Sequence, residues 1–456
     1  MNIIIVGDGK VGYTLADQLG MEGHNITVID RNEKNLRHTM ETLDVMGVLG
    51  NGASSSVQME AGVQNADIVI ASTSADETNM ICCLTAKSLG AKNTIARIRN
   101  PEYMAQLGML KEQFGLSMTV NPELEAAREI ARVIKFSPAA GIETFSKGRV
   151  ELIEFRLGDN CLLAGKKLSE LHLATDTRVL ICAVNRDDEV IIPDGSFVLN
   201  AGDHIHITGE TRDISKFLRS IGENEGFKIR AIMIVGGGRI GYYLAKMLDD
   251  RGIDIKIIEI NEARCEELSD LLPRAAIVCG DGSEIELLES EGLEDMDAFV
   301  ALTGFDEENL IMSMVANHKK VPKIVTKTGR FKYVSLINRM GIDTVVNPKM
   351  TTASQIVQYV RSMQNSVSLS NIKTLHKIVD GKAEAVEFAA NGNTRHLDVP
   401  LSKLSLKKNL LIAVLVRAGK VIIPHGKDSI QKGDSVIVVT GGSHHLRDLN
   451  DIFSEE

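Results

Sequence analysis

The second half of this 456-residue chain repeats the first half, and this repeat constrains the fold more than any other feature of the sequence. Residues 3–33, IIIVGDGKVGYTLADQLGMEGHNITVIDRNE, align without a gap with residues 232–262, IMIVGGGRIGYYLAKMLDDRGIDIKIIEINE, and 15 of the 31 positions are identical. Residues 48–54 and 66–79 match residues 278–284 and 296–309 in the same order. Each motif must therefore be interpreted as one of a pair.

A second kind of unit follows each copy of the first. GRVELIEF (148–155) pairs with GKAEAVEF (381–388), VIIPDG (190–195) with VIIPHG (421–426), and AGDHIHITG (201–209) with KGDSVIVVTG (432–441). The plan is thus A-B-A-B. We expect four domains, at residues 1–134, 148–222, 229–360 and 375–456, with residues 135–147 and 361–374 as linkers.

Unit A alternates short β-branched runs with helical patterns, which is typical of a parallel sheet covered by helices on both faces. Six strands are expected in the first copy, as in a doubly wound sheet: Ile3–Val6, Asn25–Asp30, Val45–Leu49, Ile68–Ala71, Thr94–Arg97 and Ser117–Val120. Unit B has short alternating runs separated by turn residues, such as Val179–Val184 and His204–Gly209, and predicts a β-rich unit with about one helix. The predicted class is α/β: two Rossmann-like doubly wound parallel sheets, each followed by a small β-rich α+β subdomain.

Composition and charge exclude several classes of function. The chain has 51 Lys and Arg against 61 Asp and Glu, a net charge of −10, which disfavours binding to nucleic acid or anionic lipid. Apolar runs such as Leu410–Val416 are seven residues long, whereas a membrane span needs about 18. The six cysteines include no C-x-x-C pair, and no signal peptide opens the sequence. We therefore expect a cytoplasmic protein without direct membrane insertion.

A glycine-rich loop joins a strand to a helix in each copy of unit A. Gly7-Asp8-Gly9-Lys10-Val11-Gly12 and Gly236-Gly237-Gly238-Arg239-Ile240-Gly241 both fit G-x-G-x-x-G. The first glycine of this pattern permits a tight turn, the second lets the backbone approach a pyrophosphate, and the third allows close packing of helix on strand. Free N–H groups and the positive helix end then bind phosphate.

An acidic residue ends the second strand of each copy, 18 residues after the last loop glycine: Asp30 in the first and Glu259 in the second. A carboxylate at this place accepts hydrogen bonds from ribose hydroxyls. Loop and acid together predict a nucleotide site in at least one copy. They favour NAD or an adenosine ligand over NADP, because a carboxylate repels a 2′-phosphate.

Two further pairs recur where ligands of open sheets bind, and each also has a structural explanation. Asn51-Gly52 and Asp281-Gly282 either contact the adenine side of a ligand or serve only as turns. Thr73-Ser74 and Thr303-Gly304 follow the fourth strand. Ser74 and Glu77 also fit a capping box, which would make the first of these pairs a helix start.

Cations and Asn-Pro pairs recur at the same edge. Arg97 and Lys327 end the fifth strand of each copy and are either phosphate ligands or solvated strand-end charges. Asn121-Pro122 and Asn347-Pro348 are interpreted as helix starts, with Asn as cap and Pro in the first turn.

Groups for catalysis are not evident beside the expected cofactor, although an oxidoreductase needs an acid or base there. Tyr242-x-x-x-Lys246 has a dehydrogenase-like spacing but starts directly after the third glycine, at the pyrophosphate end. His204-x-His206 suits a metal pair, but the second copy has Ser435 and Ile437 at the corresponding positions. We therefore expect a solvated strand face there, no metal, no catalytic residue and no enzyme.

The paired motifs GDGKVG…VID…GNGAS…TSADETN…ARIR and GGGRIG…IIE…GDGSE…TGFDEEN, each followed by VIIPDG or VIIPHG, resemble the regulatory subunits of Trk-type potassium uptake systems over essentially the whole chain. The resemblance implies two RCK (regulator of K⁺ conductance) domains, each with a Rossmann and a C-terminal subdomain. It also implies a cytoplasmic homo-oligomeric ring, expected to be a tetramer, peripheral on the inner face of the membrane.

The same resemblance implies a function. Such proteins gate a membrane potassium-translocating subunit of the TrkH/TrkG type in response to NAD(H) and ATP or ADP. Family nucleotide contacts carry over to Gly7 through Val11, Asp30, Thr73, Ser74 and Arg97, and in the second copy to Gly236 through Ile240, Glu259 and Lys327. Two alternatives stay open: an NAD-dependent oxidoreductase, and a cyclic-dinucleotide-binding module acting through unit B.

Overall fold

The computed structural model describes residues 1–135, 141–146, 149–158, 161–170, 177–187, 189–221, 229–249, 252–330, 342, 344–367, 371–379, 382–441 and 446–454. The expected boundaries at residues 148, 222 and 456 fall outside these ranges. Within them, every helix is too short or too polar to cross a membrane.

Both copies of unit A form a six-stranded parallel sheet, which confirms the predicted doubly wound fold. The strand orders, β3-β2-β1-β4-β5-β6 and β14-β13-β12-β15-β16-β17, are equivalent. The strands of the first sheet are β1 (Asn2–Val6), β2 (Asn25–Asp30), β3 (Met46–Leu49), β4 (Ile68–Ala71), β5 (Asn93–Arg97) and β6 (Met118–Val120). Each lies within one residue of its predicted position. The second sheet contains β12 (Ala231–Val235), β13 (Asp254–Glu259), β14 (Ala276–Cys279), β15 (Ala298–Ala301), β16 (Lys323–Lys327) and β17 (Thr344–Val346).

Helices cover both faces of these sheets, which is why the central strands are apolar throughout. In the first copy they are α1 (Lys10–Met21), α2 (Glu33–Thr42), α3 (Ser55–Glu60), α4 (Asp76–Ser88), α5 (Pro101–Ala105), α6 (Leu107–Gln113) and the short 3-10 helix η1 (Val63–Asn65). In the second they are α10 (Arg239–Asp249), α11 (Glu262–Leu271), α12 (Ile285–Ser290), α13 (Asp306–His318) and η2 (Leu293–Asp295).

The two B units are five-stranded sheets with antiparallel pairing, in the orders β10-β9-β11-β8-β7 and β18-β19-β22-β20-β21. Their strands are β7 (Gly141–Phe145), β8 (Val150–Arg156), β9 (Val179–Arg186), β10 (Glu189–Ile191), β11 (His204–Gly209), β18 (Ile372–Ile378), β19 (Ala383–Ala389), β20 (Leu410–Arg417), β21 (Lys420–Ile422) and β22 (Ser435–Gly441). The first unit adds helix α9 (Thr211–Ser220), and the second adds η4 (Leu401–Lys403) and η5 (Leu449–Ile452). One apolar cluster joins the two sheets, with Phe145 and Leu152 packed among Val414 and Val439.

The expected linkers are only partly irregular. Residues 141–145, inside the first, form strand β7, because Ile142 and Phe145 are buried by the sheets around them. Residues 361–367, inside the second, continue a helix to Val367, and Ile372 already begins β18. The Ser- and Asn-rich composition of this segment concealed its regular structure.

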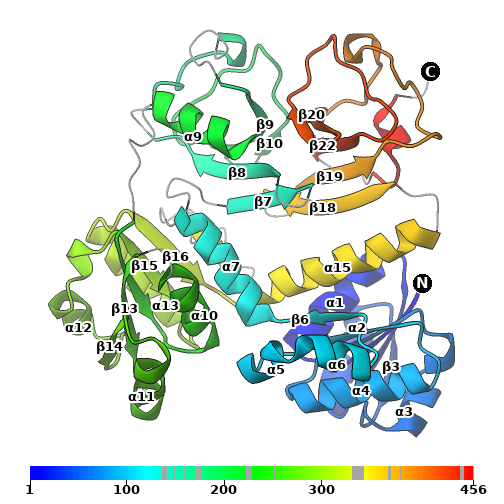
Figure 1. The fold of residues 1–456 in the computed structure, drawn as a ribbon, viewed down its shortest axis with the longest axis vertical. Helices are drawn as coiled ribbons and strands as arrows, with labels where there is room; N and C mark the ends of the chain where they lie inside the picture. The colour runs from blue at the N-terminus through cyan, green and yellow to red at the C-terminus, as the bar shows by residue number, and fades with distance from the viewer. Residues whose placement is uncertain are drawn as a thin grey trace.

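Two helices cross from one half of the chain to the other. Helix α7 (Pro122–Lys135) leaves the first sheet and buries Ala127 and Ile130 with Leu244 of α10 in the second half. Helix α15 (Pro348–Val367) leaves the second sheet and buries Ile356 against Leu15 of α1 in the first. In Figure 1, α7 lies beside α10, and α15 extends above α1. Each Rossmann unit is therefore completed by a helix of the other half.

Candidate functional site

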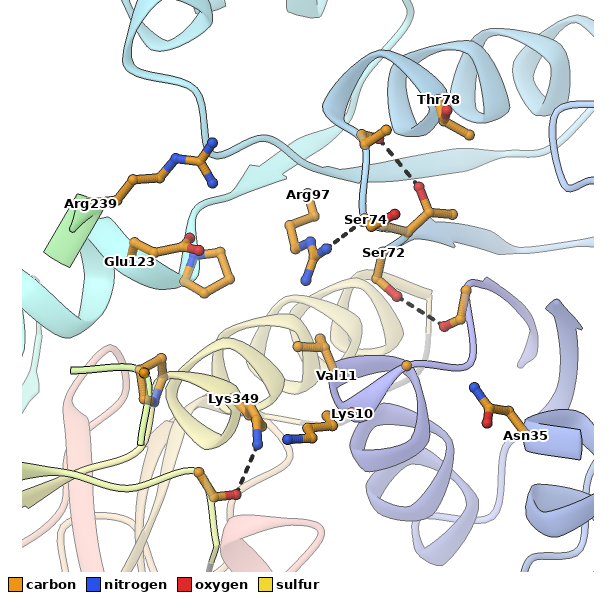
Figure 2. A pocket seen from close by; sticks show the side chains of 18 of the residues that line it. Lys10, Val11, Asn35, Ser72, Ser74, Thr78, Arg97, Glu123, Arg239 and Lys349 are labelled. Atoms are coloured by element: carbon orange, nitrogen blue, oxygen red, sulfur yellow. Dashed lines mark hydrogen bonds between the residues drawn. The ribbon is translucent and has the colours of Figure 1, made fainter. Parts of the chain in front are cut away.

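A cavity of about 1100 Å³ lies between the two Rossmann units at the carboxyl ends of their strands. It brings together 16 of the residues that the sequence predicted: Gly7, Gly9, Lys10, Val11, Asp30, Asn51, Gly52, Thr73, Ser74, Arg97, Gly238, Arg239, Ile240, Gly241, Gly304 and Lys327. Figure 2 shows part of this wall, with the first turns of α7 and α15 facing into it. Asp8, Gly12, Gly236, Gly237, Glu259, Asp281 and Thr303 are not among the residues that line it.

The first and third glycines of each phosphate loop are required by the fold itself. Gly7 and Gly236 have φ angles of +101° and +107°, a region that side chains rarely permit. A Cβ atom on Gly12 would lie 1.9 Å from the Gly7 carbonyl oxygen, and one on Gly241 would lie 2.3 Å from that of Gly236. These four glycines would be needed without any ligand.

The middle glycine of each loop has no such structural requirement. Apart from the adjacent backbone, no atom lies within 4 Å of a Cβ built on Gly9 or on Gly238. Both residues border the cavity, and Gly9 caps helix α1 without a side-chain hydrogen bond. This open approach to a helix N-terminus fits a pyrophosphate, which needs close contact with backbone N–H groups.

The acids at the ends of β2 and β13 hold the phosphate loops in place. Asp30 accepts hydrogen bonds from the backbone N–H of Asp8 at 2.5 Å and of Asn32 at 2.7 Å. Glu259 does the same for Gly237 at 2.7 Å and Asn261 at 2.9 Å. The sequence predicted only ribose binding for these two acids. Each also connects its phosphate loop to the end of its strand through hydrogen bonds.

The first copy is open at its ribose end, whereas the second is filled. Arg264 stands where the first copy has Asn35, and its Nε donates to the Gly237 carbonyl oxygen at 2.9 Å. Leu268 closes the same region, since its Cδ1 lies 2.4 Å from where a Gly237 Cβ would be. Asp30 and Asn35 line the cavity, and Glu259 does not. The two sites are therefore unequal.

Asp8 turns away from the cavity, and its side chain belongs to the core. It is 4 % exposed. Burial raises the pKa of its carboxyl group, the Thr39 hydroxyl lowers it, and the Asp30 charge raises it again. Its backbone N–H donates to Asp30, so Asp8 holds the loop rather than lining the cavity.

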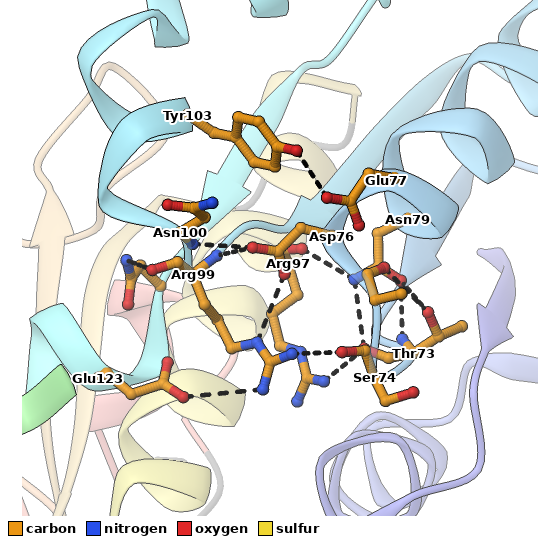
Figure 3. A network of polar contacts seen from close by, with 12 residues as sticks. Thr73, Ser74, Asp76, Glu77, Asn79, Arg97, Arg99, Asn100, Tyr103 and Glu123 are labelled. Carbon is orange, nitrogen blue, oxygen red and sulfur yellow. Dashed lines mark hydrogen bonds and ion pairs between the residues drawn. The ribbon is translucent and has the colours of Figure 1, made fainter. Parts of the chain in front are cut away.

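A buried asparagine in each copy organises the loop after the fourth strand. Asn79 Oδ1 accepts from the Thr73 N–H at 2.8 Å and the Thr73 hydroxyl at 2.7 Å, while its Nδ2 donates to the Arg97 carbonyl oxygen at 2.8 Å (Figure 3). Asn309 repeats these bonds with Thr303 and Lys327. Sequence reasoning did not single out these asparagines, although both recur at the end of a matched segment.

The predicted capping box at Ser74 and Glu77 does not form. Helix α4 begins at Asp76, and its cap residue, Ala75, makes no side-chain cap hydrogen bond. Asp76 instead accepts from the backbone N–H groups of Arg99 and Asn100 at 2.7 and 2.8 Å. The helix therefore starts one residue later than the capping box predicts, and Ser74 lines the cavity.

The strand-end cations are directed into the cavity and half-buried. Arg97 donates to the Thr73 carbonyl oxygen, and burial, followed by the Arg99 charge, lowers its pKa. Lys327 donates to the Leu302 carbonyl oxygen at 3.1 Å, and burial lowers the pKa of its amine. Both are thus positioned for an anion by backbone contacts.

The glycines of the Asn51-Gly52 and Asp281-Gly282 pairs have a structural role. A Cβ on Gly52 would lie 2.1 Å from Val6 Cγ1, and one on Gly282 would lie 2.2 Å from Val235 Cγ1, so these glycines permit packing. Asp281 accepts from the Ser283 N–H and hydroxyl.

The Asn-Pro pairs are helix starts, as predicted. Asn121 Oδ1 accepts from the Leu124 N–H at 2.9 Å, and Asn347 Oδ1 accepts from the Lys349 N–H at 3.2 Å.

The histidine pair on β11 is not on a solvated face, contrary to expectation. His206 is 2 % exposed, because β11 lies between β8 and β9, and Glu154 lies opposite it with Oε2 at 3.6 Å from Nε2. Burial lowers the pKa of His206. In the described ranges, no three His, Cys, Asp or Glu side chains are placed to hold a metal ion. Tyr242 is a buried packing residue beside Lys246.

Comparisons with known proteins agree with this architecture. The TrkA-N domain family matches residues 3–122 and 232–348, and the TrkA-C domain family matches residues 152–222. The chain belongs to the TrkA family. It is 34% identical to "Trk system potassium uptake protein TrkA homolog 2" of Methanosarcina mazei, over 96% of this chain and 97% of the relative. It is also 34% identical to "Trk system potassium uptake protein TrkA" of Halomonas elongata, over 99% and 98%.

Solved structures share the fold of this TrkA-family chain at low sequence identity. The GsuK RCK domain superposes with a TM-score of 0.63 at 20% identity, covering 97% of this chain and 92% of that one. The GsuK channel bound to NAD gives the same TM-score and identity over 97% and 77%. The chain thus shares the fold of the GsuK RCK domain over nearly its whole length.

Proposed function

We propose that the chain is a regulatory subunit that binds NAD(H) and ATP or ADP between its Rossmann units and gates a membrane potassium-translocating subunit of the TrkH/TrkG type. The observation that carries this proposal is that a single cavity is lined by both phosphate loops and by the first turns of both crossing helices. A ligand there contacts both halves of the chain, so its binding energy depends on the angle between them.

The nucleotide assignment rests mainly on the first copy. The open approach at Gly9, the acid Asp30 and the cation Arg97 border one continuous space, which suits a pyrophosphate with a ribose at one end. GsuK, which shares the fold, has been solved bound to NAD and bound to ADP. That supports the same two ligand classes for this chain.

Gating would follow from unequal affinity for two conformations. To shift an equilibrium from 1:99 to 99:1, the ligands together must supply about 5.5 kcal/mol of differential binding. Several modest sites in a homo-oligomeric ring, expected to be a tetramer, supply this jointly. In this proposal the chain lies on the inner face of the membrane through its partner.

We infer a sensor rather than a dehydrogenase from the state of the cavity's cations. Arg97, Lys327 and Lys349 each donate to a backbone carbonyl oxygen. These hydrogen bonds hold the three cations in place as anchors for an anionic ligand. NADH absorbance should therefore stay constant when the protein is incubated with alcohols, aldehydes and hydroxy acids. Steady turnover that Gly9→Asp abolishes would favour the oxidoreductase.

Potassium flux into liposomes that contain the membrane partner tests the regulatory role. Flux is measured with and without the protein, under ATP, ADP, NAD and NADH, and with Gly9→Asp as a matched variant that blocks the first loop. We expect nucleotide-dependent flux that the variant loses. Flux that ignores both protein and nucleotide would contradict gating, and calorimetry on the same samples would show separately whether nucleotide binds.

A further inference from the structure

The crossing helices begin with matched segments that differ in the sign of one charge. Asn121-Pro122-Glu123 opens α7, and Asn347-Pro348-Lys349 opens α15. Because α7 packs on α10 and α15 packs on α1, each first turn lies near the phosphate loop of the opposite half. Both Glu123 and Lys349 line the cavity. The exchange of helices thus brings a cation toward one loop and a carboxylate toward the other.

The ammonium group of Lys349 is held close to the first phosphate loop. Its Nζ donates to the Gly329 carbonyl oxygen at 2.9 Å, and it points toward the ammonium of Lys10, the first residue of α1 (Figure 2). Burial lowers the pKa of Lys349 most, and the Lys10 charge lowers it next. Two like charges therefore face each other at the entrance to a phosphate loop.

The carboxylate of Asp306 offsets only part of this repulsion: its charge raises the pKa of Lys349, against the effects of burial and of Lys10. The nearby Asp306 accepts from the Gly329 N–H at 2.9 Å, and neither Lys10 nor Lys349 forms an ion pair within the described ranges. An arrangement of this kind costs electrostatic free energy unless an anion lies between the two groups. The geometry is that of a site for phosphate charge beyond the pyrophosphate on the loop.

Glu123 produces the opposite environment at the second loop. It lies near Arg239 at the start of α10 (Figure 2), and its Oε1 is 4.0 Å from Arg99 Nη1. Its Oε2 is buried without a hydrogen-bond partner. A carboxylate here opposes additional phosphate charge and offsets the cations around it.

We propose that Lys349, reaching across from the second half, makes the first phosphate loop select nucleotides with a free polyphosphate tail over dinucleotides. This inference rests on the proposed nucleotide binding and adds its selectivity. ATP and ADP carry a terminal phosphate that can lie between Lys10 and Lys349, whereas the pyrophosphate of NAD is esterified at both ends and carries less charge. Lys349 acts on the ligand from the opposite half, so its contact also joins the halves when a polyphosphate binds.

The test is calorimetry with ATP, ADP and NAD in a Gly238→Asp background, which blocks the second loop at a position with open space. Lys349→Gln should weaken the binding of ATP about tenfold. It should weaken the binding of NAD much less, so the ratio of ATP affinity to NAD affinity falls. Lys349→Arg should keep the preference. Lys166→Gln, which removes the same charge from an exposed position in the first B unit, should change neither affinity.

Three results distinguish the inferences. If the preference for ATP over NAD is lost in Lys349→Gln but kept in Lys349→Arg and Lys166→Gln, the selectivity assigned to Lys349 is supported. Equal changes in ATP and NAD affinity, or no change, would overturn it while leaving nucleotide binding intact. If the Gly238→Asp parent binds none of the three nucleotides, the proposed nucleotide site itself is wrong, and the selectivity with it.

Discussion

The Thr351 hydroxyl, in α15, donates a hydrogen bond of 2.9 Å to the Glu129 carboxylate, in α7. This bond links the two crossing helices. Burial raises the pKa of Glu129 to about 7, the Glu143 charge raises it as well, and the Thr351 hydroxyl lowers it. The contact between the halves thus contains a carboxyl group that titrates near neutral pH.

Glu129→Gln should remove a pH dependence of stability. In the unfolded chain Glu129 titrates near 4.5, and in the folded chain near 7, so the folded state retains a proton that the unfolded state loses. The contribution of Glu129 to the free energy of unfolding is therefore fully present below pH 4.5 and is lost as the pH rises to about 7. At pH 8 the variant should be more stable by about 1–3 kcal/mol. Denaturant unfolding from pH 5 to 8 measures this, and parallel profiles for both proteins would contradict it.

Asp30→Asn should weaken nucleotide binding at the first loop. The change keeps the shape but removes a charged acceptor, which costs about 1.5–3 kcal/mol of binding free energy. Glu259→Gln is the matched control, since Glu259 holds its loop in the same way but does not line the cavity. ADP calorimetry in the Gly238→Asp background should show the loss only for Asp30→Asn. Equal losses would mean that both acids act through loop stability alone.

Shortening a buried side chain in a crossing helix should destabilise the Rossmann unit of the other half, against which that helix packs. Ile130 and Ile356 occupy matched positions in α7 and α15, and both are fully buried. Ile356→Ala should loosen the first Rossmann unit, and Ile130→Ala the second, each by about 2–5 kcal/mol. Hydrogen exchange should rise in β1 and β2 for the former and in β12 and β13 for the latter. Ile311→Ala, at a position that is 58% exposed, is the control and should change hydrogen exchange little. A rise in hydrogen exchange confined to the half that carries the substitution would contradict this prediction.

Glu387→Ala should weaken the contact between the two B units. Its carboxylate accepts from the Ser146 N–H at 2.9 Å and the Ser146 hydroxyl at 2.8 Å, and also from the Ser435 hydroxyl. Removing it leaves all three donors without this acceptor, at a cost of about 1–3 kcal/mol for each buried donor, whereas Ser146→Ala loses only one bond to the carboxylate, of about 1.5–3 kcal/mol. Denaturant midpoints should fall in that order. A larger effect of Ser146→Ala would contradict this assignment.

Much of the fold could be predicted because local patterns determine it. The runs at Ile3–Val6 and Ile68–Ala71 are buried strands in which β-branched residues pack between helix layers, and their positions were predicted to within one residue. The positions of the phosphate loops follow from the glycines, whose steric requirements are local. The repeat doubled each of these signals.

The contacts between the halves could not be predicted from such patterns. Periodicity shows that one face of α7 is buried but does not show against which sheet. The change from Glu123 to Lys349 is visible in the sequence, yet it acquires meaning only when the helices are seen to cross. Arg264 was equally hidden, because the contact that fills the second site is to a carbonyl oxygen of the loop, whereas the sequence pattern suggests only its pairing with Glu267.

The crossing of α7 and α15 also affects how the chain is made. On a ribosome the first Rossmann unit emerges with the apolar surface of α1 uncovered, and helix α15 follows only about 200 residues later. At about 5–20 residues per second, that interval lasts on the order of ten seconds or more. During it, an early sheet exposes the patch that Ile356 and Val360 will later cover. Nascent chains of this protein should therefore depend on chaperones until their second half has been synthesised.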